Sequence, residues 1–220
     1  MSEQRHLVNN CDPKTNGEMF LWNYLSKDCK IMFDVGCHTD NYYVLEHPSI
    51  IFHLFEPHPG FFETAASKCK DCTNVFMNNI GLGMEECTLD YYERGQSFVN
   101  RFGEQPSRQI QVTTIDKYME IHEISHIDFL KIDVEGFEYD VIKGSLQSIS
   151  KIKHIQFEYG GTFPERNVLL KDVYDMLEGR QIYMIGPDGL YSRQEAIEHK
   201  QYCNYLATND AESLATIIRS

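Results

Sequence analysis

Short apolar runs alternate with amphipathic stretches along this sequence, and that alternation constrains the fold more than any other feature. The apolar runs have the length of β-strands, and the stretches between them have the spacing of helices. Such alternation is typical of an α/β domain, in which helices connect parallel strands. We therefore predict strands at residues 31–35, 50–55, 75–77, 127–132, 152–157, 181–185 and 202–207.

The predicted strands divide the chain into a lead-in and one domain. Residues 1–30 contain one helix-like segment, and residues 31–210 hold the strand–helix pattern. A length of 220 residues fits a single α/β domain. Residues 88–113 break the pattern, because alternating segments at 88–92 and 109–113 flank a long polar loop. This arrangement predicts an antiparallel hairpin or lid insertion.

Acidic residues outnumber basic ones, 33 to 20, for a formal net charge of −13. Because affinity for nucleic acid rests largely on phosphate neutralisation, this balance disfavours nucleic acid and anionic membranes as partners. No apolar run reaches the about 18 residues of a membrane span, and the polar first 30 residues hold no secretory signal. We interpret the one CxxC pair, Cys69 and Cys72, as two thiols at a helix end. The cysteine usage predicts a cytoplasmic protein with reduced thiols.

Acidic residues stand where four of the predicted strands stop: Asp34, Glu56, Asp133 and Glu158. Open α/β sheets bind ligands at the carboxyl ends of their strands. Gly36 follows the first strand, and Glu56 lies 22 residues after Asp34. A glycine turn followed by a carboxylate at this spacing is typical of a nucleoside-binding unit. The glycine admits the ligand to the backbone, and the carboxylate accepts the ribose hydroxyls.

The turn after the first strand disfavours a dinucleotide. The segment 36–40 lacks the further glycines that lay a pyrophosphate on a helix N-terminus, and Asp40 would repel phosphate. A nucleoside with a positive centre is compatible with Asp34 and Asp40. S-adenosylmethionine (SAM) has a ribose, an adenine and a sulfonium, so SAM is the cofactor we expect.

Five segments share a pattern with a known family: FDVGCH at 33–38, FEP at 55–57, TTID at 113–116, FLKIDVEGFE at 129–138 and IQFE at 155–158. In order and spacing they resemble the FkbM family of SAM-dependent methyltransferases over about residues 31–160. The last strands continue the pattern to about residue 207. The most specific motif is LKIDVEG at 130–136.

The resemblance implies a Rossmann-like, seven-stranded class I methyltransferase fold, with a mostly parallel sheet and a reversed last strand. It implies SAM as the methyl donor and a hydroxyl oxygen as the acceptor, often on a sugar or a polyketide. By motif position, Asp34 and Gly36 would contact the methionine part of SAM, and Glu56 would hold the ribose. The implied cofactor-binding residues are Asp34, Gly36, Cys37, His38, Glu56, Pro57, Asn78 and Asn79, with the two asparagines near the adenine.

The same resemblance places Lys131, Asp133, Glu135 and Glu158 on the reaction side. Two routes of catalysis remain open. In one, Asp133 or Glu158 is the general base, and Lys131 steers its charge or helps to deprotonate the acceptor. In the other, Asp133 and Glu158 bind Mg²⁺, which lowers the pKa of the acceptor hydroxyl. Lys131 also suits a structural ion pair with Asp133 or Glu135, and Glu138 reads as a solvated helix residue.

Three functions follow from these residues. The leading hypothesis is an O-methyltransferase for a sugar, glycan or other small molecule. The alternatives are 2′-O methylation of RNA and an inactive binding module, the last because Asp40 replaces a family glycine. We expect an acceptor-binding lid in the insertion, carried by Tyr91, Tyr92, Arg94, Phe98, Arg101 and Phe102.

Overall fold

The computed structural model describes residues 10–39, 42–100, 102–160, 162–199 and 201–219. The predictions made for Asp40 and Arg101 lie outside these residues.

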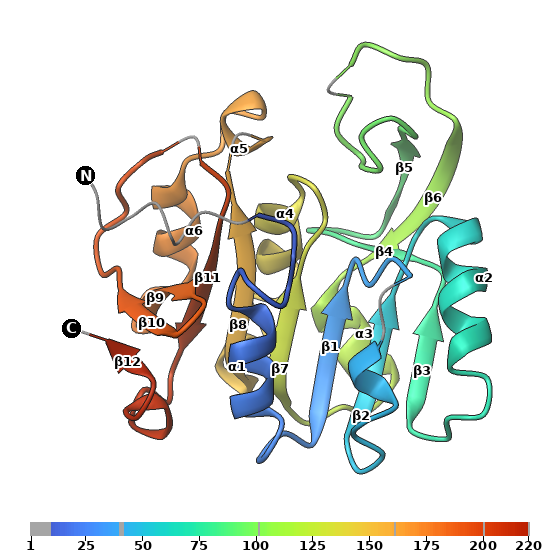
Figure 1. The fold of residues 1–220 in the computed structure, drawn as a ribbon. Helices are drawn as coiled ribbons and strands as arrows, with labels where there is room; N and C mark the ends of the chain where they lie inside the picture. Colours follow the sequence, from blue (N-terminus) through green and yellow to red (C-terminus); the bar gives the residue numbers. More distant parts are fainter. Residues whose placement is uncertain (1–9, 40–41, 101, 161, 200, 220) are drawn as a thin grey trace.

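A twisted, mostly parallel sheet forms the centre of the fold (Figure 1). Its order is β12-β10-β9-β11-β8-β7-β1-β2-β3. The strands are β1 (Ile31–Val35), β2 (Ile51–Phe55), β3 (Val75–Asn78), β7 (Ile127–Ile132), β8 (Ile152–Tyr159), β9 (Gln181–Gly186), β10 (Gly189–Ser192), β11 (Cys203–Thr208) and β12 (Ile218–Arg219). Strands β3, β2, β1, β7 and β8 pair in parallel, whereas β11 runs antiparallel to both β8 and β9. The predicted seven-stranded sheet with a reversed last strand is therefore confirmed.

Two further strands extend the sheet beyond the predicted seven. β10 pairs antiparallel with β9 across a tight turn, and β12 pairs in parallel with β10. The sequence at 189–192 is too short and mixed for its alternation to predict a strand. β8 is longer than predicted, because it continues through Glu158 to Tyr159.

Helices cover both faces of the sheet. They are α1 (Glu18–Leu25), α2 (Pro59–Lys68), α3 (Ile115–Ile121), α4 (Glu138–Lys143), α5 (Thr162–Glu165) and α6 (Leu170–Met176), with short 3-10 turns η2 (Tyr42–Val44), η3 (Ile149–Lys151) and η4 (Glu212–Leu214). Proline in its first turn and the His58 ring, which accepts a hydrogen bond from Phe61 N, fix where α2 begins. Cys69 caps the other end of α2, so the CxxC pair lies at a helix end as predicted.

The helix predicted in the lead-in is α1, which packs on the sheet through Trp22. The Trp22 ring stacks on Phe129 of β7, with ring centroids 6.0 Å apart, and contacts Phe52 of β2 and Tyr43 of η2. Burying so many aromatic rings gives α1 most of its stability, since an isolated helix of this length is marginal in water. The lead-in is thereby joined to the core, and Cys11, Pro13 and Glu18 of the lead-in reach the carboxyl ends of the strands.

The insertion and residues 81–82 before it form a second, three-stranded sheet with the order β4-β6-β5. Its strands are β4 (Gly81–Leu82), β5 (Cys87–Tyr91) and β6 (Arg108–Thr113). β5 and β6 pair antiparallel, which confirms the predicted hairpin. In Figure 1 this sheet stands beyond the carboxyl ends of β1, β2 and β3.

Candidate active site

The loops that follow β1 and β7 touch at Gly36. Its φ of +85° lies in the left-handed region, and a Cβ built there would lie 1.9 Å from the Asp133 carbonyl oxygen. Glycine is therefore required for both backbone angle and space. The close approach places the ends of two neighbouring strands within one site.

Glu56, at the end of β2, has a carboxylate fixed by the backbone. Its two oxygens accept hydrogen bonds from His38 N at 2.9 Å and from His58 N at 2.8 Å. Burial raises the pKa of Glu56 to about 7, against the lowering effect of these two bonds. The carboxylate is thus pre-positioned and still has lone pairs for a ligand.

Glu56 faces a cavity of about 360 Å³ between the strand ends and the small sheet. Pro57 and Phe61 line it from α2 and the turn before it, and Tyr91 and Phe98 line it from the insertion. A cavity that combines apolar side chains with the fixed carboxylate of Glu56 suits a nucleoside, whose base is flat and whose ribose is polar.

The two asparagines predicted near the adenine make other contacts. The Asn78 amide donates to the carbonyl oxygens of Leu54 and Phe76, and the Asn79 amide donates to those of Glu56 and Pro57. Neither side chain lines the cavity. They hold β3 and the following turn against β2, so the cavity wall on this side is formed instead by the next residues, Ile80 to Leu82.

His38 lies between the two halves of the site. Its φ of +47° is left-handed, and its ring packs on Phe61 with centroids 3.9 Å apart. Its neighbour Cys37 is buried beneath the loop, and burial raises the pKa of that thiol. His38 lines the cavity just described and also a second one beside it.

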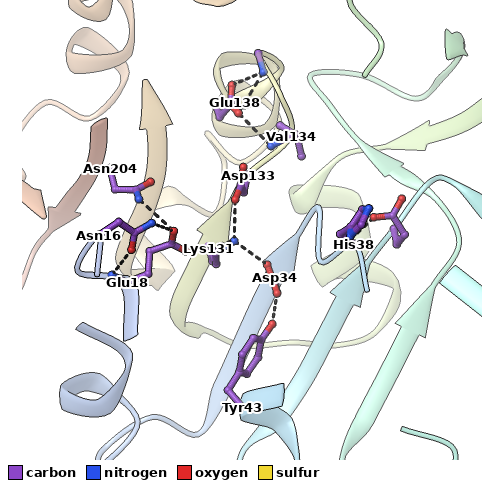
Figure 2. Close-up of polar contacts among 12 residues, drawn as sticks. Asn16, Glu18, Asp34, His38, Tyr43, Lys131, Asp133, Val134, Glu138 and Asn204 are labelled. Carbon is purple, nitrogen blue, oxygen red and sulfur yellow. Dashed lines mark hydrogen bonds and ion pairs between the residues drawn. The ribbon is translucent and has the colours of Figure 1, made fainter. Parts of the chain in front are cut away.

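Lys131 lies at the centre of a cluster of carboxylates (Figure 2). Its ammonium is 3.2 Å from Asp133 Oδ2, 3.7 Å from Glu18 Oε2 and 3.8 Å from Asp34 Oδ1. Burial alone would lower the pKa of Lys131, but the three carboxylates outweigh it and hold that pKa well above its usual range. The predicted ion pair with Asp133 is confirmed, and the raised pKa disfavours Lys131 as a base.

Asp34 is the most deeply buried member of this cluster. Its Oδ2 accepts a hydrogen bond from the Tyr43 hydroxyl, whereas Oδ1 is buried and has no hydrogen-bond donor. Burial raises the pKa of Asp34, while Lys131 and Tyr43 oppose the shift. A buried carboxylate oxygen without a donor is costly unless a ligand supplies one.

A second cavity of about 340 Å³ adjoins the first. The side chains of Glu18, Asp34, Lys131, Asp133, Glu135 and Glu158 line it, together with those of Cys11, Pro13 and Tyr202. Five residues line both cavities: Cys11, Gly36, His38, Asp133 and Glu135. The structure thus brings together all four residues predicted for the reaction side, and Asp133 and Glu135 lie at the junction.

Glu138 is buried, so the prediction of a solvated helix residue was wrong. The loop before it turns through left-handed φ values of +54° at Glu135 and +100° at Gly136. The Glu138 carboxylate accepts hydrogen bonds from Val134 N and Gly136 N, both at 3.0 Å. Burial raises the pKa of Glu138 to about 8. A glutamate two residues after the glycine of this motif was the signal that sequence reasoning missed.

Because Glu138 holds this loop, we expect Glu138→Ala to destabilise the protein. Leaving two buried N–H groups without an acceptor costs about 2–5 kcal/mol at about 1–3 kcal/mol each. The free energy of unfolding in urea measures the loss. Exposed Glu178, which follows α6, gives a control variant, Glu178→Ala, which we expect to fall within about 0.5 kcal/mol of the parent. A loss for Glu138→Ala no larger than the control's would contradict this role.

The insertion covers the first cavity rather than the second. Tyr91, Ser97 and Phe98 line the first, and the Ser97 hydroxyl donates to the Glu135 carbonyl oxygen at 3.0 Å. Arg94 and Phe102 instead pair with each other in the outer loop, 4.4 Å from cation to ring centroid. Of the described residues predicted for an acceptor-binding lid, Tyr91 and Phe98 thus line the first cavity and none lines the second, and the direction in which a hairpin folds is not encoded in its alternation.

No three His, Cys, Asp or Glu side chains in the described part of the chain are positioned to share a metal ion. Asp133 Oδ2 already accepts a hydrogen bond from the Lys131 ammonium. The predicted Mg²⁺ site at Asp133 and Glu158 is therefore not supported. None of the described helices is long and apolar enough to cross a membrane.

Comparisons with known proteins agree with this geometry. A family model described as the methyltransferase FkbM domain matches residues 34–182. The solved methyltransferase FkbM from Methylobacillus flagellatus KT has a TM-score of 0.54 and 17% identity, over 81% of this chain and 44% of its own. The METTL16 methyltransferase domain has a TM-score of 0.51 and 11% identity, over 92% of this chain and 69% of its own. These likenesses confirm the class I methyltransferase fold. No curated protein matches the chain.

Proposed function

This chain belongs to the FkbM methyltransferase domain family, and we propose that it is a SAM-dependent O-methyltransferase acting on a sugar, glycan or other small-molecule hydroxyl. The observation that carries the proposal is the pair of adjoining cavities, which share Asp133 and Glu135. One cavity suits the nucleoside of the cofactor and the other suits a polar acceptor. The chain spans less than half of the FkbM methyltransferase from Methylobacillus flagellatus, so activity is assigned from this chain's own site.

The residues of the first cavity fit the adenosine part of SAM. The fixed carboxylate of Glu56 accepts the ribose hydroxyls, and Phe61 and Phe98 offer apolar faces to the adenine. Gly36, which has no side chain, lets the methionine part approach the backbone toward Asp34. When bound, SAM supplies an electrophilic methyl carbon attached to a sulfonium.

We assign the general base to Asp133. It lies at the junction of the cavities, where an acceptor hydroxyl and the methyl donor would meet, and it takes the proton that the hydroxyl loses. Lys131 is a positioning residue, because its ammonium hydrogen-bonds Asp133 at 3.2 Å and fixes the direction of the carboxylate. Glu135 is the second carboxylate at the junction of the two cavities. Glu158 lines only the second cavity, on the acceptor side.

RNA as the acceptor is disfavoured by charge. The second cavity carries five carboxylates and one ammonium, and the whole chain carries −13. Both would repel phosphates. The inactive-module alternative rested on Asp40, and the test below decides it through cofactor binding.

Thermal unfolding with S-adenosylhomocysteine (SAH) tests the cofactor, and transfer of labelled methyl from SAM tests the reaction. Ligand at about 100 times its Kd adds about 2.7 kcal/mol, which we expect as a rise in Tm of about 5–11 °C. Label should then appear as an acid-stable ether on a hydroxylated acceptor. No SAH shift would favour the inactive module, and label found only on amines would exclude O-methylation.

A further inference from the structure

We propose that His58 is a positioning residue for the cofactor: it ties residues 91–98 of the insertion over the first cavity and so slows the release of bound SAM or SAH. We call residues 91–98 the strap. This inference rests on the proposed function, which assigns the first cavity to the cofactor. It follows from the contacts that His58 makes with three elements and from the unequal strength of the two anchors of the strap.

His58 lies next to the first cavity without lining it. Its backbone N–H donates to Glu56 Oε1 at 2.8 Å, which fixes the carboxylate assigned to the ribose. Its ring packs on the rings of Phe61 and Tyr91, with centroid distances of 4.3 Å and 5.7 Å. Both of those rings line the cavity. His58 therefore acts on a bound cofactor through its neighbours.

The two ring nitrogens of His58 face different elements. Nδ1 accepts a hydrogen bond from Phe61 N at 3.3 Å, so Nε2 carries the ring proton. Nε2 lies 3.3 Å from Glu93 Oε2 in the strap, and Glu93 also forms an ion pair with Arg108 of β6. Gly60 leaves room for the ring, because a Cβ there would lie 3.1 Å from His58 Cε1. The ring thus joins the first turn of α2 to the strap.

The other end of the strap is anchored more firmly. Ser97 is buried, and its hydroxyl donates to the Glu135 carbonyl oxygen at 3.0 Å. The Phe98 ring packs on Phe137, with centroids 5.2 Å apart. A Cβ built at Gly81 would lie 2.7 Å from Phe98 Cζ, so this ring lies directly against β4. Aromatic packing and a hydrogen bond from a buried hydroxyl together hold this end.

The His58 end is the weaker anchor, so it is the end at which the strap opens. The Glu93 side chain is 44% exposed, and an ion pair with an exposed partner is weak because water screens it. Tyr91, Ser97 and Phe98 of the strap line the cavity. A strap released from His58 therefore encloses the cofactor less, and the bound ligand leaves sooner.

Two single variants and their combination test this role by surface plasmon resonance of SAH on the immobilised protein. His58→Asn keeps a side-chain oxygen that caps α2 but loses the ring that reaches Glu93. Glu93→Gln keeps an oxygen for Arg108 but loses the charge. We expect each variant to raise the dissociation rate constant about two- to fivefold, as the loss of a partly exposed ion pair gives. The association rate constant should change less.

The double variant separates this contact from a general structural effect. Because both changes remove the same contact, the double variant should release SAH about as fast as the faster single variant, and more slowly than the product of the two effects predicts. Effects that multiply would overturn the proposal, because each residue would then act alone. A role of His58 in the stability of α2 alone would lower the Tm of His58→Asn and show no coupling to Glu93.

Glu86→Gln is the matched control. It removes the same charge from an exposed bend outside both cavities, and it should leave the dissociation rate constant unchanged. Single variants that match this control would also overturn the proposal. SAH binding by the parent protein is measured first. A parent that does not bind SAH would contradict the proposed function itself, whereas SAH binding without coupling between His58 and Glu93 would contradict only the role of His58.

Discussion

Replacement of Glu56 by alanine is expected to weaken SAH binding by about two orders of magnitude. Its carboxylate is held by two backbone N–H groups and faces the first cavity. A hydrogen bond to a charged group contributes about 1.5–3 kcal/mol, and about 1.4 kcal/mol changes Kd tenfold. Losing the hydrogen bonds from two ribose hydroxyls to the Glu56 carboxylate therefore accounts for a rise of about a hundredfold or more in the Kd for SAH.

Calorimetric titration with SAH measures the loss. Glu63→Ala is the matched control, because Glu63 lies on the exposed side of α2 outside both cavities. Glu63→Ala should bind SAH as the parent does. If Glu56→Ala binds SAH within threefold of the control, the ribose is not held by Glu56 and the assignment of the first cavity to the cofactor fails.

The same carboxylate predicts how binding changes with pH. Burial raises the pKa of Glu56 to about 7, and the ionised form is the better acceptor for ribose hydroxyls. SAH affinity should therefore rise as the pH rises through 7, with a slope near tenfold per unit below that value. In Glu56→Gln the slope between pH 5.5 and 7 should disappear. An unchanged slope in this variant would assign the titration to another group.

Glu56 also affects the stability of the ligand-free protein, and its contribution falls as the pH rises, whereas SAH affinity increases. An acid whose folded pKa lies above its unfolded value stabilises most below the unfolded pKa of about 4.5, and the contribution is lost as the pH rises through about 7. The site thus holds a carboxylate at a cost in stability that bound cofactor repays, as expected for a binding residue.

The main strands and the position of the site were predictable because both depend on local pattern. Apolar runs of strand length predicted where the strands lie. Acidic residues at the ends of those runs predicted the sheet edge at which ligands bind. The carboxyl ends of parallel strands converge on that edge. Asp34, Glu56 and Asp133 therefore meet there whatever the details of the helices.

The remaining features depend on contacts that spacing does not encode. Glu18 reaches Lys131 across more than a hundred residues of sequence because Trp22 packs α1 on the sheet. Glu138 turns inward because two left-handed residues precede it and leave N–H groups that need an acceptor. The insertion covers the first cavity because the Ser97 hydroxyl donates a hydrogen bond to the Glu135 carbonyl oxygen. None of these three is visible as a periodicity.

Lys131→Met is expected to lower the free energy of unfolding by about 3 kcal/mol. The ammonium lies within 3.8 Å of carboxylates from Glu18, Asp34 and Asp133, and Asp34 has almost no exposure. Removing one partner of a buried ion pair costs about 3–5 kcal/mol. We take the lower value because the Asp133 side chain is 39% exposed and partly screened by water. For a chain of this size the fall in Tm is about 6–12 °C.

Thermal unfolding checks this prediction, with Lys151→Met as the control, because Lys151 is exposed in η3. The difference between Lys131→Met and the parent should shrink as the pH falls from 8 to 5. Without the ammonium, the buried carboxylates take up protons more readily, and burial already raises the pKa of Asp34. A loss that is independent of pH, or no larger than that of Lys151→Met, would contradict the electrostatic explanation.

The double variant Asp34→Asn/Lys131→Met separates charge from packing. If Lys131→Met is unstable because it leaves an uncompensated buried carboxylate, neutralising Asp34 should recover part of the lost Tm. If the loss comes from the shape of the methionine side chain, the second change adds to it. Recovery would mean that Lys131 is retained to hold three carboxylates beside the junction of the cavities. Neutral side chains at these positions would be easier to bury. They would, however, leave Asp133 without the hydrogen bond from Lys131 that positions it.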